Sequence, residues 1–282
     1  MIVSTARLLD AADRAVVLDF SDPALGLLLN YVDIGFGNVR GSATPRTGQD
    51  GTVDVTSFVA EAPVTAEVTL PAVPASYYQV EDRLRALMHP SLRYYLHVLR
   101  PGWPAERRTL VRAASFACPP ARPKVAQLGW VAVNGTFEDA ASTSITLSPL
   151  SNAESGLSTP IALPAAFPAG YLPGQSSVTI GGTAPTLPIV HIYGPVTNPK
   201  VVFGQLTWAL NGSIGAQDYL HVNFADRVVW LNSDPNQSMY GQVDFTATTW
   251  WSMPPGRAQI GFYPDVAAPP AQAVVTWRNR YL

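Results

Sequence analysis

The last third of the sequence places the tightest limit on what the chain can fold into. Between residues 177 and 282, about eight short segments alternate apolar and polar residues, and turn-forming residues separate them. Such alternation puts every second side chain on the same face of a β-strand. Short strands at this spacing are typical of an antiparallel sandwich, so we predict that architecture for the second half of the chain.

The first part of the chain combines strand-like segments with one helical segment. Residues 77–90 carry apolar side chains at helical spacing, which predicts an amphipathic helix that Pro90 ends. Residues 91–100 and 107–117 follow as a predicted β-hairpin. Gly, Ser, Thr and Pro dominate residues 41–51, so we expect an exposed loop there. The apolar face of the helix consists of Val80, Leu84, Leu87 and Met88.

The uneven distribution of charge divides the chain into two predicted domains. Residues 1–125 hold 13 Lys or Arg and 12 Asp or Glu, whereas residues 126–282 hold 5 and 8. A proline-rich stretch at residues 117–123 lies at this change in composition. We therefore predict a first domain over 1–125 and a second over 126–282.

Charged residues make up only 13% of the chain, about half the usual share in soluble proteins. Two interpretations stay open: a surface of uncharged polar residues, or apolar surface that meets other subunits. The net charge of −2 favours neither nucleic acid nor an anionic membrane as a partner.

The single cysteine, Cys118, excludes an intramolecular disulfide, and we expect a buried thiol. Without an 18-residue apolar run or a signal-peptide pattern, we expect no membrane span.

The sequence contains no recognisable catalytic or metal-binding motif. Acidic residues of the second half are scattered, and the patterns of a P-loop, a dinucleotide-binding loop and a nucleophile elbow are missing. None of the four histidines stands at a spacing that holds a metal. We predict no catalytic residues, no cofactor and no metal. The histidines are His89, His97, His191 and His221.

Arginine is concentrated in one part of the first domain. Aromatic residues among these arginines would suit a nucleic-acid surface, whereas nearby acidic residues suit a structural or intersubunit role. We favour the second interpretation, with Arg93 and Arg112 as candidate interface residues. The cluster consists of Arg83, Arg85, Arg93, Arg100, Arg107, Arg108 and Arg112.

The segment HIYGPVTNPKVVF, at residues 191–203, places a Gly-Pro and an Asn-Pro between two strand-like runs. Gly194, Asn198 and Pro199 are typical turn-forming residues. We expect them to shape a strand connection rather than to hold a ligand.

Several segments, taken in order, resemble the distal tail proteins of long-tailed bacteriophages, particularly those of phages that infect actinobacteria. VRGSATPRTGQDGTVDVTSF, at 39–58, is similar to a family segment with an Arg, a Pro-containing loop and Asp-Gly-Thr-x-Asp-x-Thr. DRLRALMHPSLRYYLHV, at 82–98, resembles the family's helix that ends in His-Pro, and RTLVRAASF resembles its partner strand. The matching residues of the first segment are Arg40, Pro45, Asp50, Gly51, Thr52, Asp54 and Thr56.

The resemblance continues in the second half. YGPVTNPKVVF is similar to the family's Gly-x-x-x-Asn-Pro turn, and VVTWRNRYL looks like its closing strand. TTWWSMPPGRAQIGF resembles a Trp-x-x-x-x-Pro-Gly-x-Asn-x-Ile segment, in which Pro255 and Gly256 form a turn. Two departures stand out. Residues 60–62 read Ala-Glu-Ala where the family often carries Gly-Ala-Arg, and Ala258 replaces the Asn.

This resemblance implies a mainly β fold, with an N-terminal split β-barrel and one helix, followed by a galectin-like antiparallel β-sandwich. It implies a homohexameric ring at the tail tip of the virion, assembled in the host cytoplasm, that joins the tail tube protein to the tail-tip hub protein. Ring contacts would come mostly from the first domain. Candidate interface residues are then Arg40, Asp50, Asp54, Arg93 and Arg112.

Our hypothesis is a structural virion protein without catalysis, whose ring lets DNA pass without reading its sequence. Three alternatives stay open, because a fold does not decide a function. The second domain could bind host-surface glycan and recognise a receptor. The chain could be a glycosidase or peptidoglycan hydrolase, or a cellular β-sandwich module unrelated to phages.

Overall fold

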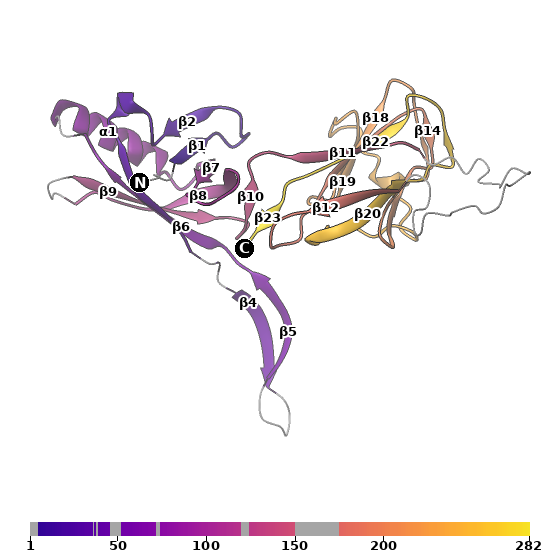
Figure 1. Cartoon of the computed structure of the whole chain (residues 1–282), viewed down its shortest axis with the longest axis horizontal. Coiled ribbons are helices and arrows are strands. Elements are labelled where there is room, and N and C mark those ends of the chain that lie inside the picture. Colours follow the sequence, from indigo (N-terminus) through magenta and orange to yellow (C-terminus); the bar gives the residue numbers. More distant parts are fainter. Residues whose placement is uncertain are drawn as a thin grey trace, which may run out of the picture. The chain divides into compact units, whose positions relative to one another are not determined.

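The chain folds into two compact units (Figure 1). Unit 1 comprises Met1–Ala141 together with Arg280–Leu282, and unit 2 comprises Ser142–Asn279. The sequence places the boundary at 125/126, whereas the units divide after Ala141. For the strands β4 (Val39–Pro45) and β5 (Thr52–Val59) only the backbone is described. The structure, a computed structural model, describes residues 5–35, 37, 39–45, 52–71, 74–119, 124–149 and 175–282.

Unit 1 is built on a nine-stranded antiparallel sheet, counted over the residues described. Seven strands follow the order β2-β1-β7-β8-β9-β6-β3, and β10 pairs with both β8 and the C-terminal strand β23. The hairpin of β4 (Val39–Pro45) and β5 (Thr52–Val59) forms a separate two-stranded sheet. The nine strands are β1 (Thr5–Leu9), β2 (Val16–Asp19), β3 (Leu28–Ile34), β6 (Ala62–Thr69), β7 (Arg93–Leu99), β8 (Arg107–Ala117), β9 (Val125–Ala132), β10 (Phe137–Asp139) and β23 (Arg280–Tyr281).

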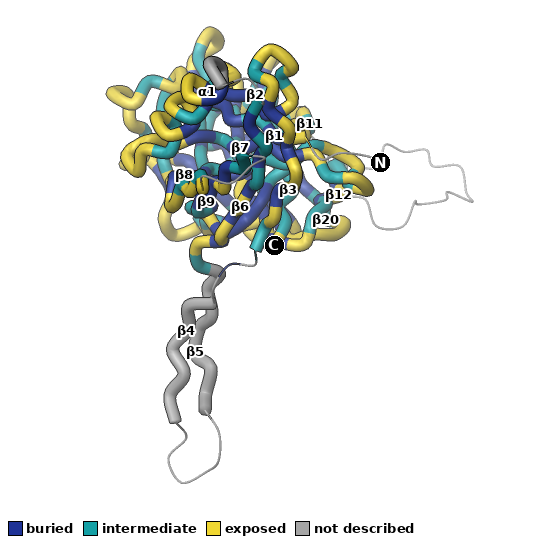
Figure 2. Tube along the Cα trace, turned by 90° about the vertical axis from the view of Figure 1, so that its left-hand side faces the viewer, coloured by how far each residue is buried: buried dark blue, intermediate teal, exposed yellow. Residues whose placement is uncertain are grey.

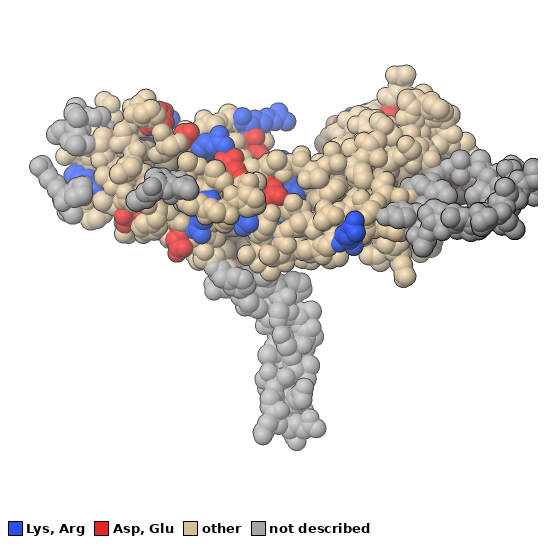
Figure 3. Space-filling view, in the orientation of Figure 1, with Lys and Arg blue, Asp and Glu red and all other residues tan. Residues whose placement is uncertain are grey.

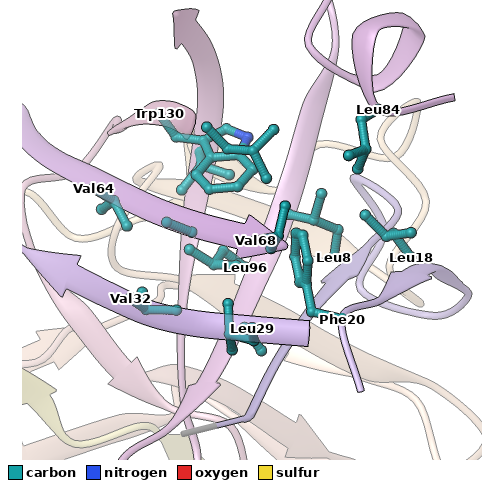
Figure 4. Close-up of a cluster of buried hydrophobic side chains, with 14 of the residues drawn as sticks. Leu8, Leu18, Phe20, Leu29, Val32, Val64, Val68, Leu84, Leu96 and Trp130 are labelled. Carbon is teal, nitrogen blue, oxygen red and sulfur yellow. The ribbon is translucent and has the colours of Figure 1, made fainter. Parts of the chain in front are cut away.

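The core of unit 1 lies between this sheet and helix α1 (Pro74–Leu87). Alternate residues of β6 are buried, as the period of a strand requires, and Figure 2 shows them in dark blue. Leu84 of the helix joins the same buried cluster as Leu18 and Phe20, which Figure 4 shows. The Phe20 ring meets Trp130 edge to face, with 6.3 Å between ring centroids. A short 3-10 helix, η1 (Pro23–Leu25), follows β2.

Unit 2 is an antiparallel sandwich. A five-stranded sheet, β11-β22-β13-β18-β19, and a four-stranded sheet, β12-β20-β15-β16, contribute their inner faces to one buried cluster. A small third sheet, β17-β14-β21, and the 3-10 helix η2 (Tyr240–Gln242) complete the described part of the unit. The strands are β11 (Thr143–Leu147), β12 (Gln175–Ile180), β13 (Ile189–Tyr193), β14 (Val196–Thr197), β15 (Lys200–Phe203), β16 (Leu206–Ala209), β17 (Ser213–Ile214), β18 (Tyr219–Asn223), β19 (Val228–Leu231), β20 (Gly256–Phe262), β21 (Val266–Ala267) and β22 (Gln272–Trp277).

The predicted fold class is confirmed, because the described residues form antiparallel sheets with one α-helix. The predicted helix is present, but it begins earlier and ends at Leu87, before His89 and Pro90. Two expectations need correction. Residues 41–45 are not loop, because they pair with β5 as part of β4, while 46–51 lie outside the described residues. Cys118 is only half-buried, and its Sγ lies 3.3 Å from the Tyr77 hydroxyl.

No helix in the described part of the chain is long and apolar enough to cross a membrane.

Two leucines on the same stretch of chain test the core of unit 1. Leu96 in β7 is 1% exposed, whereas Leu92, just before that strand, is 39% exposed. We expect Leu96→Ala to lower the free energy of unfolding by about 2–5 kcal/mol, because it leaves a cavity in a packed cluster. The matched control Leu92→Ala should change it by no more than about 0.5 kcal/mol. Urea unfolding of both variants measures the difference, and equal losses would contradict this description of the core.

Candidate interaction surfaces

A network of charges surrounds His97, which β7 holds at 6% exposure. Its Nε2 lies 2.6 Å from Oδ1 of Asp13, and its Nδ1 lies 3.3 Å from Oε2 of Glu106. Arg7 donates to both carboxylate oxygens of Glu106, at 2.7 and 2.8 Å, and Arg108 pairs with Asp13. The hydrogen bonds to Glu106 raise the pKa of Arg7. Each buried charge therefore has a partner of opposite sign, which is the condition for burying it.

Other arginines of the cluster contact aromatic rings. The guanidinium carbon of Arg107 lies 4.1 Å from the ring centroid of Trp103 and 3.4 Å from that of Tyr281. Arg108 also lies over the Tyr95 ring, at 4.5 Å. These are cation–π distances, and they attach the C-terminal strand β23 to the middle of unit 1.

The remaining members of the cluster bind backbone or acidic groups of the same chain. Arg83 donates to the Val17 carbonyl and Arg100 to the Val32 carbonyl. Arg85 pairs with Glu81 at 2.8 Å, one helical turn away. All seven arginines of the cluster therefore have partners within the chain, and an intersubunit role for any of them stays a prediction.

The candidate interface residues fall in two places. Arg93 and Arg112 stand directly opposite each other in β7 and β8. Like charges at such positions repel. Glu61 relieves the repulsion by accepting from Arg112 at 2.8 and 3.0 Å, and Arg93 donates to the carbonyls of residues 90 and 92.

The other candidates lie in the β4–β5 hairpin. Arg40 is paired with Phe58 and Asp54 with Ala43 in the backbone register of the two strands. Asp50 lies outside the described residues. The structure therefore brings Arg93 and Arg112 together and leaves the prediction for the hairpin residues untested.

The connection between β13 and β15 is held by backbone and side-chain hydrogen bonds. Asn198 has a left-handed backbone, with φ of 48°. Its amide nitrogen donates to Oδ2 of Asp265 at 2.9 Å, and its amide oxygen accepts from the Gly212 backbone at 2.9 Å. Lys200 donates to the other oxygen of Asp265, and these bonds, led by that from Asn198, lower the pKa of the Asp265 carboxyl. Both functional groups of the Asn198 amide therefore bind within the fold, as a residue that shapes a strand connection would.

The other predicted turn residues lie in the same unit. A side chain at Gly194 would meet the backbone oxygen of Gly215, so the close approach of two chain segments requires glycine. Pro199 is buried, and its carbonyl accepts from the Leu210 backbone. Gly256, after Pro255, begins β20 with φ of 126°, which favours glycine.

A row of five aromatic rings crosses the outer face of the five-stranded sheet. Centroids lie 5.5 Å apart between Tyr193 and Tyr219, 5.7 Å between Tyr219 and His191, 5.0 Å between the two histidines and 5.6 Å between His221 and Trp230. The row comes from β13, β18 and β19, which are neighbours in the sheet. The sequence predicts ordinary strand positions for these histidines, and the row cannot be predicted from it because the row depends on the strand register.

The outer face that carries this row has no formal charge at its strand positions. The strand register and the burial pattern place thirteen side chains on this outer face, and none of them is Asp, Glu, Lys or Arg. Figure 3 shows charged atoms gathered over unit 1, whereas the visible face of unit 2 is almost entirely uncharged. Burial lowers the pKa of both His191 and His221, so neither ring adds charge at neutral pH. The thirteen are Ser144, Thr146, Ile189, His191, Tyr193, Tyr219, His221, Asn223, Val228, Trp230, Gln272, Val274 and Thr276.

A second aromatic feature of unit 2 is more exposed. Phe245 is 57% exposed, and its ring centroid lies 5.4 Å from that of Tyr240. The Asp244 carboxylate fixes the turn that contains Phe245 by accepting from the backbone and hydroxyl of Thr246. The two rings form an apolar projection, which suits contact with another protein.

Among the described residues, no group of three or more His, Cys, Asp or Glu is placed to hold a metal. The sheet of unit 1 contains a hollow of about 170 Å³, and its lining includes no His, Cys, Asp, Glu, Lys or Arg. Its lining includes Tyr31, Thr65, Ser115, Gln127 and Gly129.

Comparison with known proteins gives one family match and several structural likenesses. Residues 181–281 match the family model described as the siphovirus-type tail component, C-terminal domain. No curated protein matches the chain. The crystal structure of the Dit protein (gp 19.1) of phage SPP1, described as a paradigm of the hub adsorption apparatus in phages that infect Gram-positive bacteria, is 10% identical. That likeness covers 100% of both chains with a TM-score of 0.68, and it shows that the two chains share a fold. A chain of the phage P2 baseplate in its activated conformation with Ca is 11% identical over 98% of both chains, with a TM-score of 0.48.

Two glycines of unit 2 test the close approach in the 194–199 connection. We expect Gly194→Ala to lower the free energy of unfolding by about 1–3 kcal/mol, because the added methyl group would push the Gly215 backbone away. A Cβ added at Gly241 would meet nothing within 4 Å, so Gly241→Ala should change the free energy of unfolding by no more than about 1 kcal/mol. Thermal unfolding followed by tryptophan fluorescence compares them. A Gly194→Ala variant as stable as the parent would show that the connection tolerates displacement.

Proposed function

We propose that the chain is a structural protein of a phage tail tip, which forms a ring between the tail tube protein and the tail-tip hub protein. The match of residues 181–281 to the tail-component model carries this proposal. The fold shared with SPP1 Dit over the full length of both chains supports it for the remainder. The ring is homohexameric, its lumen lets DNA pass, and it resides in the virion after assembly in the host cytoplasm. The segments at 39–58 and 82–98 favour a phage of actinobacteria.

The distribution of charge is consistent with a non-catalytic assembly protein. Most described charges of unit 1 are engaged in ion pairs with their own chain, such as Arg7 with Glu106 and Arg112 with Glu61. A six-fold ring needs a heterologous interface that closes on itself, and a permanent one buries on the order of 2,000 Å² or more. A chain with few free surface charges can bury such an area with little desolvation cost.

Negative-stain electron microscopy of the purified chain tests the ring. We expect closed rings with six-fold symmetry, and light scattering should give a mass near six times that of one chain. Antibody against the chain should label the tail tips of phage particles. A monomer at every concentration, together with unlabelled particles, would contradict the proposal.

The arginine pair tests whether unit 1 forms the ring contacts. We expect Arg93→Glu with Arg112→Glu to reduce the assembled mass to that of smaller species, because the change reverses two charges on one surface. Arg83→Glu, on the helix, serves as the matched control and should leave the mass unchanged. Adding Glu61→Arg restores the internal pair with residue 112, so assembly regained by this third change would assign the effect to the fold of the subunit.

A second candidate function is recognition of a host-surface glycan by unit 2. The uncharged aromatic row on β13, β18 and β19 favours it, because neutral sugars pack against aromatic rings and accept hydrogen bonds from amides and hydroxyls. Glycan arrays probed with the full chain would then give signals that Trp230→Ala removes. Flat arrays for the parent would exclude this function and leave the tail-tip proposal intact.

A further inference from the structure

His191 and His221 lie side by side on the outer face of the five-stranded sheet. They are directly opposite each other in the register of β13 and β18, and each is half-buried. Nε2 of His191 is 3.0 Å from Nδ1 of His221. Two imidazole nitrogens thus face each other across two adjacent strands, with no acidic or basic side chain at the outward strand positions around them.

We propose that these two histidines form an open metal site that takes Cu²⁺ or Ni²⁺. Imidazole nitrogen binds such ions at about 2.0–2.1 Å, and at that bond length a 3.0 Å separation corresponds to an angle of about 94° at the metal. The value is close to the right angle between neighbouring ligands in square-planar or octahedral geometry, which Cu²⁺ and Ni²⁺ adopt. Tetrahedral geometry, preferred by Zn²⁺, would need the nitrogens about 3.4 Å apart.

The sheet preorganises the pair. The backbones of residues 191 and 221 are fixed by ladders on both sides, to β22 and to β19. Trp230 stacks on His221, with 14° between the planes, and the Tyr219 ring meets His191 at 62°. The torsional wells about the outer bond of a histidine side chain are broad, so small ring rotations that largely keep the 3.0 Å separation can turn both nitrogen lone pairs toward one ion. The ion therefore replaces the hydrogen bond between the rings without moving a strand.

The site is open because two ligands fill only part of the coordination shell. No third metal-binding side chain accompanies the pair among the described residues, so water occupies the remaining positions. Binding would join β13 to β18 through the metal and stabilise unit 2 by mass action, since the unfolded chain does not hold the two rings together.

Titration of the full chain with Cu²⁺, followed by electron paramagnetic resonance, tests the site. We expect one ion per chain with hyperfine splitting from two nitrogens. His191→Gln and His221→Gln should each weaken binding at least tenfold, because either change removes the chelate. His89→Gln is the matched control, since His89 is exposed in unit 1 and its ring nitrogen Nδ1 lies 2.7 Å from the Ser91 hydroxyl. Binding that survives both single variants, or that His89→Gln alone removes, would overturn the proposal.

A second measurement guards against variants that simply fold badly. Circular dichroism of the metal-free variants should match that of the parent. Saturating Ni²⁺ should then raise the melting temperature of the parent and of His89→Gln, and leave both site variants unchanged. Tighter binding of Zn²⁺ than of Ni²⁺ would overturn the geometric assignment, and an unchanged parent melting temperature would overturn the site.

Discussion

The burial of His97 between two carboxylates is the interaction on which the charge arrangement of unit 1 depends. Both ring nitrogens of His97 face carboxylate oxygens, Nε2 that of Asp13 and Nδ1 that of Glu106. Asp13 and Glu106 each bind an arginine as well, so four charged partners surround one buried ring. Because removal of one member would leave the others uncompensated, the network fixes β1, β7, β8 and the turns that carry the two acids as one group.

The two units differ in the number of their charged residues and in the use they make of them. The arginines of unit 1 bind carbonyls, carboxylates and aromatic rings of their own unit. Arg107, for example, contacts the rings of Trp103 and Tyr281, which lie far apart in the sequence. Unit 2 has few charges, and its exposed sheet face carries rings, hydroxyls and amides in their place. An uncharged face of this kind desolvates easily, which makes it suited to assembly or to binding uncharged ligands.

Local patterns in the sequence were sufficient to predict helix α1 and the β7–β8 hairpin, because apolar spacing and Pro90 act over a few residues. The Gly- and Pro-rich composition around residues 41–45 misled, since pairing with β5 overrides weak local preference. Contacts between distant segments could not be predicted. His97 meets an acid 84 residues away, and His191 meets His221 only because of the strand register. The arginine cluster was visible in the sequence, whereas its partners within the chain were not.

The unit boundary shows most clearly why composition could not define the domains. A cut after residue 125 would remove all but the first residue of β9, which pairs with β6 along its whole length and with β8 over residues 127–132. It would also remove β10 and the last strand, β23, whose Tyr281 stacks under Arg107. Unit 1 is therefore discontinuous in sequence and needs the last residues of the chain to complete its sheet. Unit 2 is one continuous segment inserted between β10 and β23, and pairings such as β11 with β22 and β12 with β20 close its two sheets across most of that segment.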